Sequence, residues 1–279
     1  MISILLLTYN EESALPNCLK HIDWCDDIVV IDSYSTDESV NICEKAGARI
    51  FLRKFDNFAG QRNYGLAEID FKHEWVFHLD ADELFTDELR IECESIVRAD
   101  GPNGAYLVPS KMMLWGKWLK HAASYPVYQM RFHKIGDALF EQYGHGQRET
   151  ELKRGLGTLC QAYEHHSFEK GLGHWFNRHN QYSTDEALQS IELLKKKSFS
   201  VNKLFSRNIL ERRRSLKQLS YKLPFRWFIK FLYLFIMKRG FLDGRAGFTY
   251  CSLHACYEHM IVVKQKEILL SKGQKFKNF

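Results

Sequence analysis

The sequence lacks the features that mark membrane-spanning, disulfide-stabilised and repetitive proteins. It contains no internal repeat or low-complexity tract, and its seven cysteines are scattered without a Cys-x-x-Cys pair. Such cysteines argue against a disulfide scaffold and a zinc ribbon, and they are typical of a reducing cytosol. The apolar run at 231–237 has seven residues, whereas a membrane span needs about 20.

Two further signals are missing near the N-terminus. No basic segment precedes the apolar residues 2–7 and no cleavage site follows them, so we expect a first β-strand here and not a signal peptide. Nucleotidyltransferases hold a triphosphate in a glycine-rich basic loop, and no such loop follows this strand. The sequence therefore disfavours that class of enzyme.

The composition is that of a protein with a substantial core. Hydrophobic residues make up 45% of the chain and aromatic residues 14%, which excludes a disordered protein. A length of 279 residues allows one large domain, or one domain with an appendage.

Charge is distributed unevenly along the chain. Residues 195–239 contain fourteen Lys or Arg residues and one acid, Glu211, although the net charge of the whole chain is only +5. An acidic body with a basic tail predicts an anionic partner, either a membrane or a nucleic acid. Arg226 and Lys230 would share one helix face beside several aromatic residues, which favours a helix lying in the membrane interface. Packing of this helix against the rest of the chain is nearly as compatible with the pattern.

Short aliphatic runs alternate with helical patterns over the first part of the chain, and each run ends in a small polar cluster. This alternation predicts an α/β fold built on a parallel sheet, where ligands bind beyond the carboxyl ends of the strands. The expected strands are 2–7, 27–32, 49–53, 75–79, 105–109 and 128–134, and the expected helices are 13–22, 37–46, one after 58, one near 86, and 174–197.

The most informative segment is 75–83, an apolar run that ends in the acids Asp80, Asp82 and Glu83. Asp80 and Asp82 are two residues apart, so an extended strand would put both carboxylates on one face. Carboxylates directed at one point repel each other unless a cation lies between them, and oxygen ligands suit Mg²⁺ or Mn²⁺. On these residues alone, capping of the next helix by Asp82 or Asp87 is an equal alternative.

Four segments together resemble the family 2 glycosyltransferases with the GT-A fold, and in particular the bacterial lipopolysaccharide-core and exopolysaccharide glucosyltransferases. The segments are LTYNEE at 7–12, VIDSYSTD at 30–37, FAGQRNYGL at 58–66 and LDADE at 79–83. Their order and spacing carry the resemblance, which no single segment would support.

The resemblance implies a domain organisation and a set of donor-binding residues. A GT-A catalytic domain would cover 1–180, with a nucleotide-sugar half at 1–110 and an acceptor half at 111–180, and a helical amphipathic extension would cover 181–279. The nucleotide-sugar residues carried over from the family are Thr8, Tyr9, Asn10, Glu11, Asp32, Ser35, Arg62, Asn63, Asp80 and Ala81. Taken singly, Tyr9 could be a rim aromatic, Arg62 a solvated charge and Asp32 a turn residue.

The resemblance also implies the roles of the catalytic and metal-binding groups. Asp80 and Asp82 would form the DxD-type motif, which binds the ribose and, through Mn²⁺ or Mg²⁺, the diphosphate. His165 is a candidate third metal ligand, with a structural histidine as the alternative. Relatives often carry a His-Glu pair near 141–149, and this chain departs from that pattern. Glu149 is our candidate for the general base, and a salt bridge, for instance to Arg148, is an equal alternative.

These features predict an inverting, metal-dependent glycosyltransferase. It would transfer a hexose, with glucose as the best guess, from a UDP-sugar to a lipopolysaccharide-core or lipid-linked acceptor. We expect it to act in the cytoplasm, peripherally on the inner face of the cytoplasmic membrane and through 195–239, without a nucleic-acid partner. The alternatives are a polyprenyl-phosphate sugar transferase and, in another class, a non-catalytic nucleic-acid-binding protein that uses the basic segment.

Overall fold

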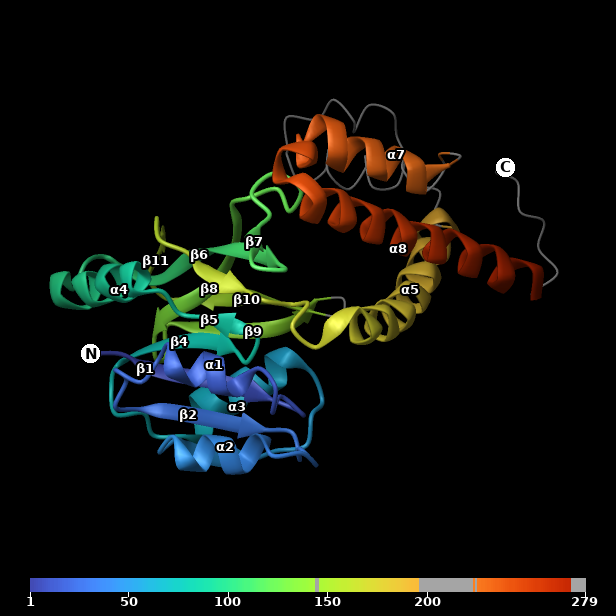
Figure 1. Cartoon of the computed structure of the whole chain (residues 1–279). Coiled ribbons are helices and arrows are strands. Elements are labelled where there is room, and N and C mark those ends of the chain that lie inside the picture. Colours follow the sequence, from blue (N-terminus) through green and yellow to red (C-terminus); the bar gives the residue numbers. More distant parts are fainter. Residues whose placement is uncertain (144–145, 196–222, 224, 272–279) are drawn as a thin grey trace. The chain divides into compact units, whose positions relative to one another are not determined.

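The computed structural model describes residues 1–143, 146–195, 223 and 225–271, which Figure 1 draws as coloured ribbons. They form two compact units. The first consists of residues 1–120 and 124–171, and the second of residues 121–123 together with the part of the chain after 171. Each unit is described by itself.

A mixed β-sheet forms the centre of the first unit. Its strands run in the order β3-β2-β1-β4-β8-β6-β12-β5, and β7 and β11 also pair with β6. The bounds are β1 (Ser3–Thr8), β2 (Ile28–Asp32), β3 (Arg49–Leu52), β4 (Trp75–Asp80), β5 (Glu83–Leu84), β6 (Asn103–Leu114), β7 (Lys117–Trp118), β8 (Val127–Lys134), β11 (Gly155–Thr158) and β12 (Tyr163–His165). A separate hairpin joins β9 (Ala138–Tyr143) to β10 (Gly146–Leu152).

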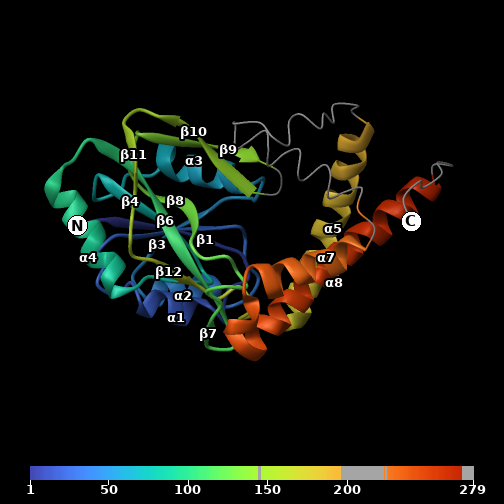
Figure 2. The ribbon, with the colours of Figure 1, turned by 90° about the horizontal axis from the view of Figure 1, so that it is seen from above.

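The first half of the sheet is parallel, and helices cover both of its faces. Strands β3, β2, β1 and β4 pair in parallel, and β1 and β2 are almost entirely buried, as their continuous aliphatic runs predict. Residues of α1 (Leu15–Lys20), α2 (Ser39–Lys45) and α4 (Asp87–Ala99) join the core on one face, and residues of α3 (Phe58–Glu68) pack on the other. Figure 2 shows α3 across the sheet from α1 and α2.

The second half of the sheet changes direction. Strand β8 is antiparallel to both β4 and β6, and β12 then pairs in parallel with β6 and antiparallel with the short β5. This return brings β12, which comes late in the sequence, beside the turn that follows β4. The predicted α/β fold with a helical extension is confirmed.

Helix α4 begins near residue 86 as expected, and the structure decides which residue caps it. The N-cap of α4 is Thr86, whose hydroxyl accepts the Leu89 N–H, so neither Asp82 nor Asp87 caps this helix. Helix α2 begins later than expected, at Ser39, with Glu38 as its N-cap. Ser35 and Thr36, the residues suited to cap a helix that begins at 37, therefore have other partners, described below.

The second unit is helical. It contains α5 (Gly171–Lys195), α7 (Arg226–Leu232), a π-helical turn η2 (Tyr233–Met237), a 3₁₀ turn η3 (Gly240–Asp243) and α8 (Gly244–Ser271). Figure 1 shows α7 lying along α8, and an ion pair between Arg226 and Glu258 joins these two helices.

Helix α5 also packs on α8, and buried aromatic and polar groups join the two. The ring of His179 on α5 is stacked on Trp175 with 3.7 Å between the centroids and meets Tyr257 of α8 edge-on. The side chains of Gln265 and Ser190 are hydrogen-bonded in the interior. Helix α8 is therefore the common support of α5 and α7.

The described residues include no helix that is long and apolar enough to cross a membrane. Most of the basic segment 195–239 lies outside the described residues, namely 196–222 and 224. The domain boundary that we predict at residue 180 falls inside α5 and stays a prediction.

Two histidines on neighbouring strands form a fully buried pair in the first unit. The Nε2 atoms of His78 (β4) and His133 (β8) are 2.7 Å apart, and the two rings are stacked with the ring of Phe140 edge-on to both. The Nδ1 of His133 lies 3.0 Å from the carbonyl oxygen of Lys134, which can only accept, so Nδ1 carries the proton. The Nε2 of His133 then accepts from the Nε2–H of His78, and the pair is neutral. Burial lowers the pKa of His133 from 6.5 to about 4.

We predict that this pair makes the first unit sensitive to acid. The unfolded chain takes up protons as the pH falls through 6.5, whereas folded His133 takes up none until about 4. Stability is therefore lost between these values, by about 2 kcal/mol for His133 alone at pH 5. Urea unfolding of wild type and His133→Asn at pH 7 and pH 5 measures this loss.

The variant should be less stable at pH 7 but should lose less stability on acidification. His21→Asn, a change at an exposed histidine, is the control and should show the wild-type pH dependence. An equal loss in wild type and His133→Asn would contradict the prediction.

Candidate active site

The ends of β1 and β2 are joined by one buried carboxylate. The two strands are parallel neighbours with Thr8 opposite Asp32, and the Asp32 side chain is 1% exposed. Its oxygens accept from the Thr8 hydroxyl at 2.8 Å and from the Ser35 N–H and hydroxyl at 2.7 and 2.6 Å. Ser35 is thus bound to Asp32 instead of capping α2.

The loop that follows β1 is held against the loop that follows β2. Asn10 adopts a left-handed conformation with φ of 53°, its N–H donates to the Ser35 hydroxyl, and its side-chain oxygen accepts the Thr36 N–H. The Glu11 N–H donates to the hydroxyl of Ser39. Tyr9, at 58% exposed, keeps its ring available to solvent at this edge. The structure thus brings together the residues predicted at 8–11, 32 and 35.

The carboxylate of Asp80, at the end of β4, is shared by two arginines. Arg62 on α3 donates to Oδ1 and Arg131 on β8 donates to Oδ2, each at 2.8 Å. Both guanidinium groups are buried. Burial alone would raise the pKa of Asp80, but the two arginines outweigh it and hold this pKa well below its usual range. Asp80 is therefore ionised.

Glu83 completes this buried network. Its Oε1 accepts from Arg131 at 2.5 Å and its Oε2 accepts the Asp80 N–H at 2.9 Å. Burial, opposed by Arg131 and assisted by the charge of Asp80, raises the pKa of Glu83 to about 7. The sequence marks Glu83 only as the last acid of its segment and gives no reason to select Arg131 as a site residue.

Asp82 and His165 meet on the other side of the same turn. Strand β12 pairs with β5 so that His165 is opposite Glu83, and the Nε2 of His165 is 3.5 Å from an Asp82 carboxylate oxygen. Burial lowers the pKa of His165, but Asp82 and the nearby carboxylates outweigh it and raise this pKa to about 9. Ala81 is buried between the two aspartates of the motif.

These side chains fit a divalent cation in part. Asp82 and His165 supply one oxygen and one nitrogen ligand close together, which suits Mn²⁺ or Mg²⁺ if a ligand provides the remaining oxygens. Within the part of the chain that the structure describes, no group of three or more His, Cys, Asp or Glu side chains is arranged to hold a metal. The predicted role of Asp80 as a metal ligand stays a prediction, since both of its oxygens accept from arginines.

The segment between β12 and α5 connects the two halves of the site. The N–H of His166 donates to the Asp82 carbonyl at 2.7 Å. Four residues later, the ammonium of Lys170 lies 2.5 Å from Glu11 and 2.7 Å from the carbonyl of Asn10. Lys170 has no motif around it, so sequence analysis gave no reason to select it.

Two predicted site residues lie apart from this cluster. The side-chain amide of Asn63 donates to the Phe140 carbonyl and accepts the Phe140 N–H, which fastens the β9–β10 hairpin to α3. Glu149 lies on β10 opposite Phe140. Among the described residues, no hydrogen bond or ion pair joins Glu149 to the Asp80–Asp82 turn, and its role as base stays a prediction.

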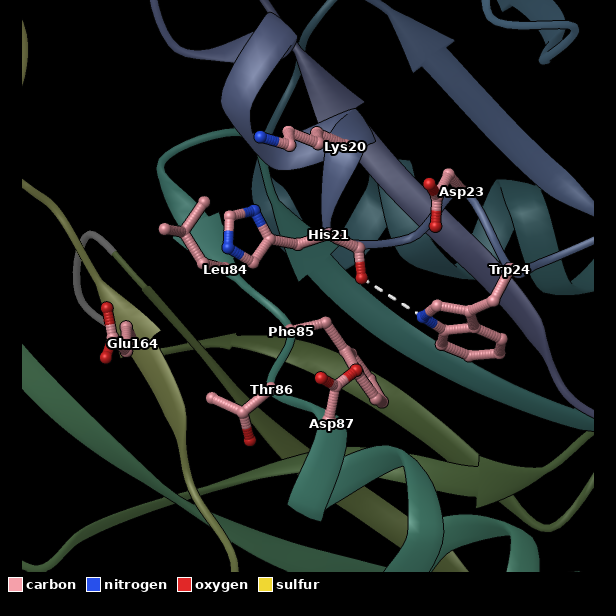
Figure 3. Close-up of a pocket in the computed structure, with 9 residues that line it drawn as sticks. All are labelled: Lys20, His21, Asp23, Trp24, Leu84, Phe85, Thr86, Asp87 and Glu164. Carbon is pink, nitrogen blue, oxygen red and sulfur yellow. Dashed lines mark hydrogen bonds between the residues drawn. The ribbon is translucent and has the colours of Figure 1, made fainter.

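A pocket of about 390 Å³ lies on the opposite face of β5 and β12. Figure 3 shows its lining, in which the indole N–H of Trp24 donates to the His21 carbonyl. Because side chains alternate along a strand, Leu84 and Glu164 face this pocket, whereas their neighbours Glu83 and His165 face the carboxylate turn. The remaining lining residues are Lys20, Asp23, Phe85, Thr86 and Asp87. This pocket is therefore separate from the cluster around Asp80.

Comparison with known proteins identifies the family. Residues 3–106 match the model of "Glycosyl transferase family 2". Over this segment the chain belongs to the family 2 glycosyltransferases. The match covers all four segments noted in the sequence, and the predicted GT-A fold is confirmed. The chain is therefore a transferase.

Individual relatives of this glycosyltransferase are distant. An uncharacterized glycosyltransferase of Rickettsia bellii is 23% identical over 96% of this chain and 87% of its own length. The lipopolysaccharide core biosynthesis glycosyltransferase LpsC of Rhizobium meliloti is 31% identical over 32% of this chain and 34% of its own length. A solved structure of Staphylococcus aureus TarS, residues 1–349, covers 99% of this chain and 93% of that chain, with 14% identity and a TM-score of 0.44.

We predict that Asp32→Ala loosens both loops of this glycosyltransferase. It leaves the Thr8 hydroxyl and the Ser35 N–H without their buried acceptor, which should cost about 2 kcal/mol of unfolding free energy. Hydrogen exchange at the Asn10, Ser35 and Thr36 amides should also become faster. Urea unfolding and exchange measured residue by residue check this.

Asp26→Ala is the matched control, because the Asp26 side chain is 50% exposed and pairs with His73 at the surface. It should change stability far less than Asp32→Ala does. Unchanged exchange at the three amides in Asp32→Ala would show that Asp32 is not what holds these loops together.

Proposed function

We propose that this glycosyltransferase is metal-dependent and inverting, and that it transfers a hexose, namely glucose, from UDP to a saccharide acceptor. One observation carries the proposal. Strand β1 lies between β2 and β4, with Asp32 opposite Thr8 and Asp80 opposite Leu7. The loops with Tyr9 and Asp32 therefore share one sheet edge with the Asp80–Asp82 turn, where an α/β sheet binds its ligands.

The first half of this edge has the groups that a uridine needs. The exposed ring of Tyr9 offers a face for stacking on the base. Asp32 is fixed by three hydrogen bonds, so an N–H of the uracil would find an acceptor already oriented. The ionised Asp80 is suited to accept hydrogen bonds from ribose hydroxyls.

The second half of the edge would hold the diphosphate. A divalent cation bound to Asp82 and His165 would neutralise the negative charge that develops on the departing UDP. Arg62 adds a fixed positive charge beside the same turn. Inversion requires a carboxylate that deprotonates the acceptor hydroxyl while it attacks the sugar C1 from the face opposite UDP. Glu149 stays our candidate for that base.

We predict that UDP binding depends on Mn²⁺ and is lost in Asp82→Ala. Removing the carboxylate takes away one of two protein ligands, so turnover of a UDP-sugar should also fall by roughly a hundredfold or more. Calorimetric titration with UDP, with and without Mn²⁺, on wild type and variant measures the binding.

Asp87→Ala is the control, since Asp87 is an exposed carboxylate five residues further along the chain, in the first turn of α4. It should bind UDP as wild type does. Metal-dependent UDP binding by Asp82→Ala would remove Asp82 from the metal site. Failure of wild type to bind UDP at all would refute the proposed donor.

The acceptor is proposed to be a lipopolysaccharide-core or lipid-linked saccharide. The similarity of this chain to LpsC over about a third of both proteins supports the first of these. A polyprenyl phosphate is the alternative acceptor. The product mass distinguishes the two, because transfer to a phosphate gives a phosphodiester and transfer to a saccharide gives a glycosidic bond.

We further propose that the second unit binds an anionic membrane surface, on the cytoplasmic side. The helix formed by α7 and η2 exposes a stripe at spacings of four residues, Phe225, Ile229, Tyr233 and Met237. Phe228, Ile236, Phe241 and Leu242 are also exposed. Between 225 and 250 the only acid is Asp243, which is buried, whereas Lys238, Arg239 and Arg245 are at least partly exposed. Apolar and basic groups without exposed acids suit a helix lying in the headgroup region.

We predict that Ile236→Ser/Met237→Ser weakens binding to vesicles that contain phosphatidylglycerol by at least about tenfold, because each apolar side chain contributes about 1.5–3 kcal/mol when buried. Vesicle co-sedimentation measures this. Val263→Ser, a change at an exposed position of α8, should bind as wild type does. Equal binding by all three proteins would refute the membrane surface, and displacement from vesicles by RNA would favour the nucleic-acid alternative.

A further inference from the structure

Arg131 reaches Asp80 from a neighbouring strand. Strands β4 and β8 are antiparallel partners, and one nitrogen of Arg131, Nη2, donates both to Asp80 at 2.8 Å and to Glu83 at 2.5 Å. The Arg131 side chain is 3% exposed. Its contacts are therefore fixed within the interior and are not those of a surface ion pair.

Glu83 closes a ring of hydrogen bonds around Asp80. One oxygen of Glu83 accepts the backbone N–H of Asp80, and the other binds Arg131, which in turn binds the Asp80 carboxylate. Backbone and side chain of Asp80 are thus tied to the same two groups. Arg62 holds the second carboxylate oxygen. The rotation of the Asp80 side chain is restrained from both sides.

Asp80 is the one member of this network that reaches solvent. Its side chain is 31% exposed, compared with 5% for Arg62, 3% for Arg131 and 0% for Glu83. Buried charges are costly even when they are paired, and apolar side chains of similar volume would stabilise the fold as well or better. Three buried charged groups around one accessible carboxylate indicate that the network serves the orientation of that carboxylate.

We propose that Arg131 is a positioning residue for the donor: held in place by Glu83, it fixes the Asp80 carboxylate in the orientation that accepts hydrogen bonds from the ribose of the nucleotide. This inference rests on the proposed UDP-sugar donor. Each Asp80 oxygen uses one lone pair on an arginine and keeps another for a hydroxyl group. Arg131 itself need not touch the donor.

The test compares UDP with its 2′-deoxy and 3′-deoxy analogues, because an oriented carboxylate discriminates against a ligand that lacks the hydroxyl it binds. Calorimetry in the presence of Mn²⁺ should give at least about a tenfold preference of wild type for UDP over one of the analogues. In Arg131→Met this ratio should fall below about threefold, as it should in Asp80→Asn. A purely structural role would weaken all three ligands equally and leave the ratio unchanged.

Two further variants keep the test decisive if Arg131→Met folds poorly. The double change Arg131→Met/Glu83→Gln also replaces the buried carboxyl group that the single change leaves without its partner, so it should unfold at higher urea than the single variant. It should still lack the preference for UDP. Arg49→Met is the matched control, because Arg49 pairs with the buried Asp27 near the opposite end of β2. It should lower stability and keep the wild-type ratio.

A wild-type ratio in folded Arg131→Met or in the double variant would overturn the proposal, and so would a wild type that binds UDP without discriminating between the analogues. If wild type binds no UDP, the proposed donor fails instead. A crystal structure of the double variant then decides whether Arg131 positions Asp80. A changed Asp80 rotamer supports positioning, and an unchanged one overturns it.

Discussion

The shared carboxylate of Asp80 is the interaction on which the site depends. Two buried guanidinium groups, from Arg62 on α3 and Arg131 on β8, require a counter-ion, and Asp80 supplies it at the end of β4. Helix α3, on one face of the sheet, and the antiparallel strand β8 must therefore both lie beside the end of β4, the last strand of the parallel half. This requirement locates the turn that carries Asp82.

A second carboxylate organises the first half of the site in a similar way. Asp32 lies at the end of β2 and accepts three hydrogen bonds from the two loops beside it. At Asp32 the donors are neutral hydroxyl and amide groups, and at Asp80 they are cations. The hydrogen bonds at Asp32 fix the geometry of the loops, and the buried arginines keep the Asp80 carboxylate ionised. The proposed nucleotide-sugar donor would use both environments.

The sequence predicted the residues at strand ends well and those joined by tertiary contacts poorly. Thr8, Asp32 and Asp80 follow apolar runs, and the ends of parallel strands meet at one edge in any α/β sheet. Arg131 follows Asp80 by about fifty residues within an alternating strand. Alternation tells which face a side chain is on but not which strand becomes its neighbour. The partner of Arg131 was therefore not predictable from the pattern.

A polar side chain can make more than one kind of hydrogen bond, and this explains two other differences between the sequence predictions and the structure. Asn63 stands beside Arg62 in a segment that resembles the family, yet its amide binds the Phe140 backbone, because an asparagine can satisfy an N–H and a carbonyl at once. Ser35 matches the preference for helix caps but binds Asp32, since the helix begins four residues later. The choice between such partners is made by the folded chain.

The contacts of His166 and Lys170 have a mechanical consequence. His166 is hydrogen-bonded to the Asp82 carbonyl, and Lys170 contacts the loop after β1. The chain enters the helical unit immediately afterwards, at residue 172. A displacement at the start of α5 would therefore act directly on the turn after β4 and on the loop after β1.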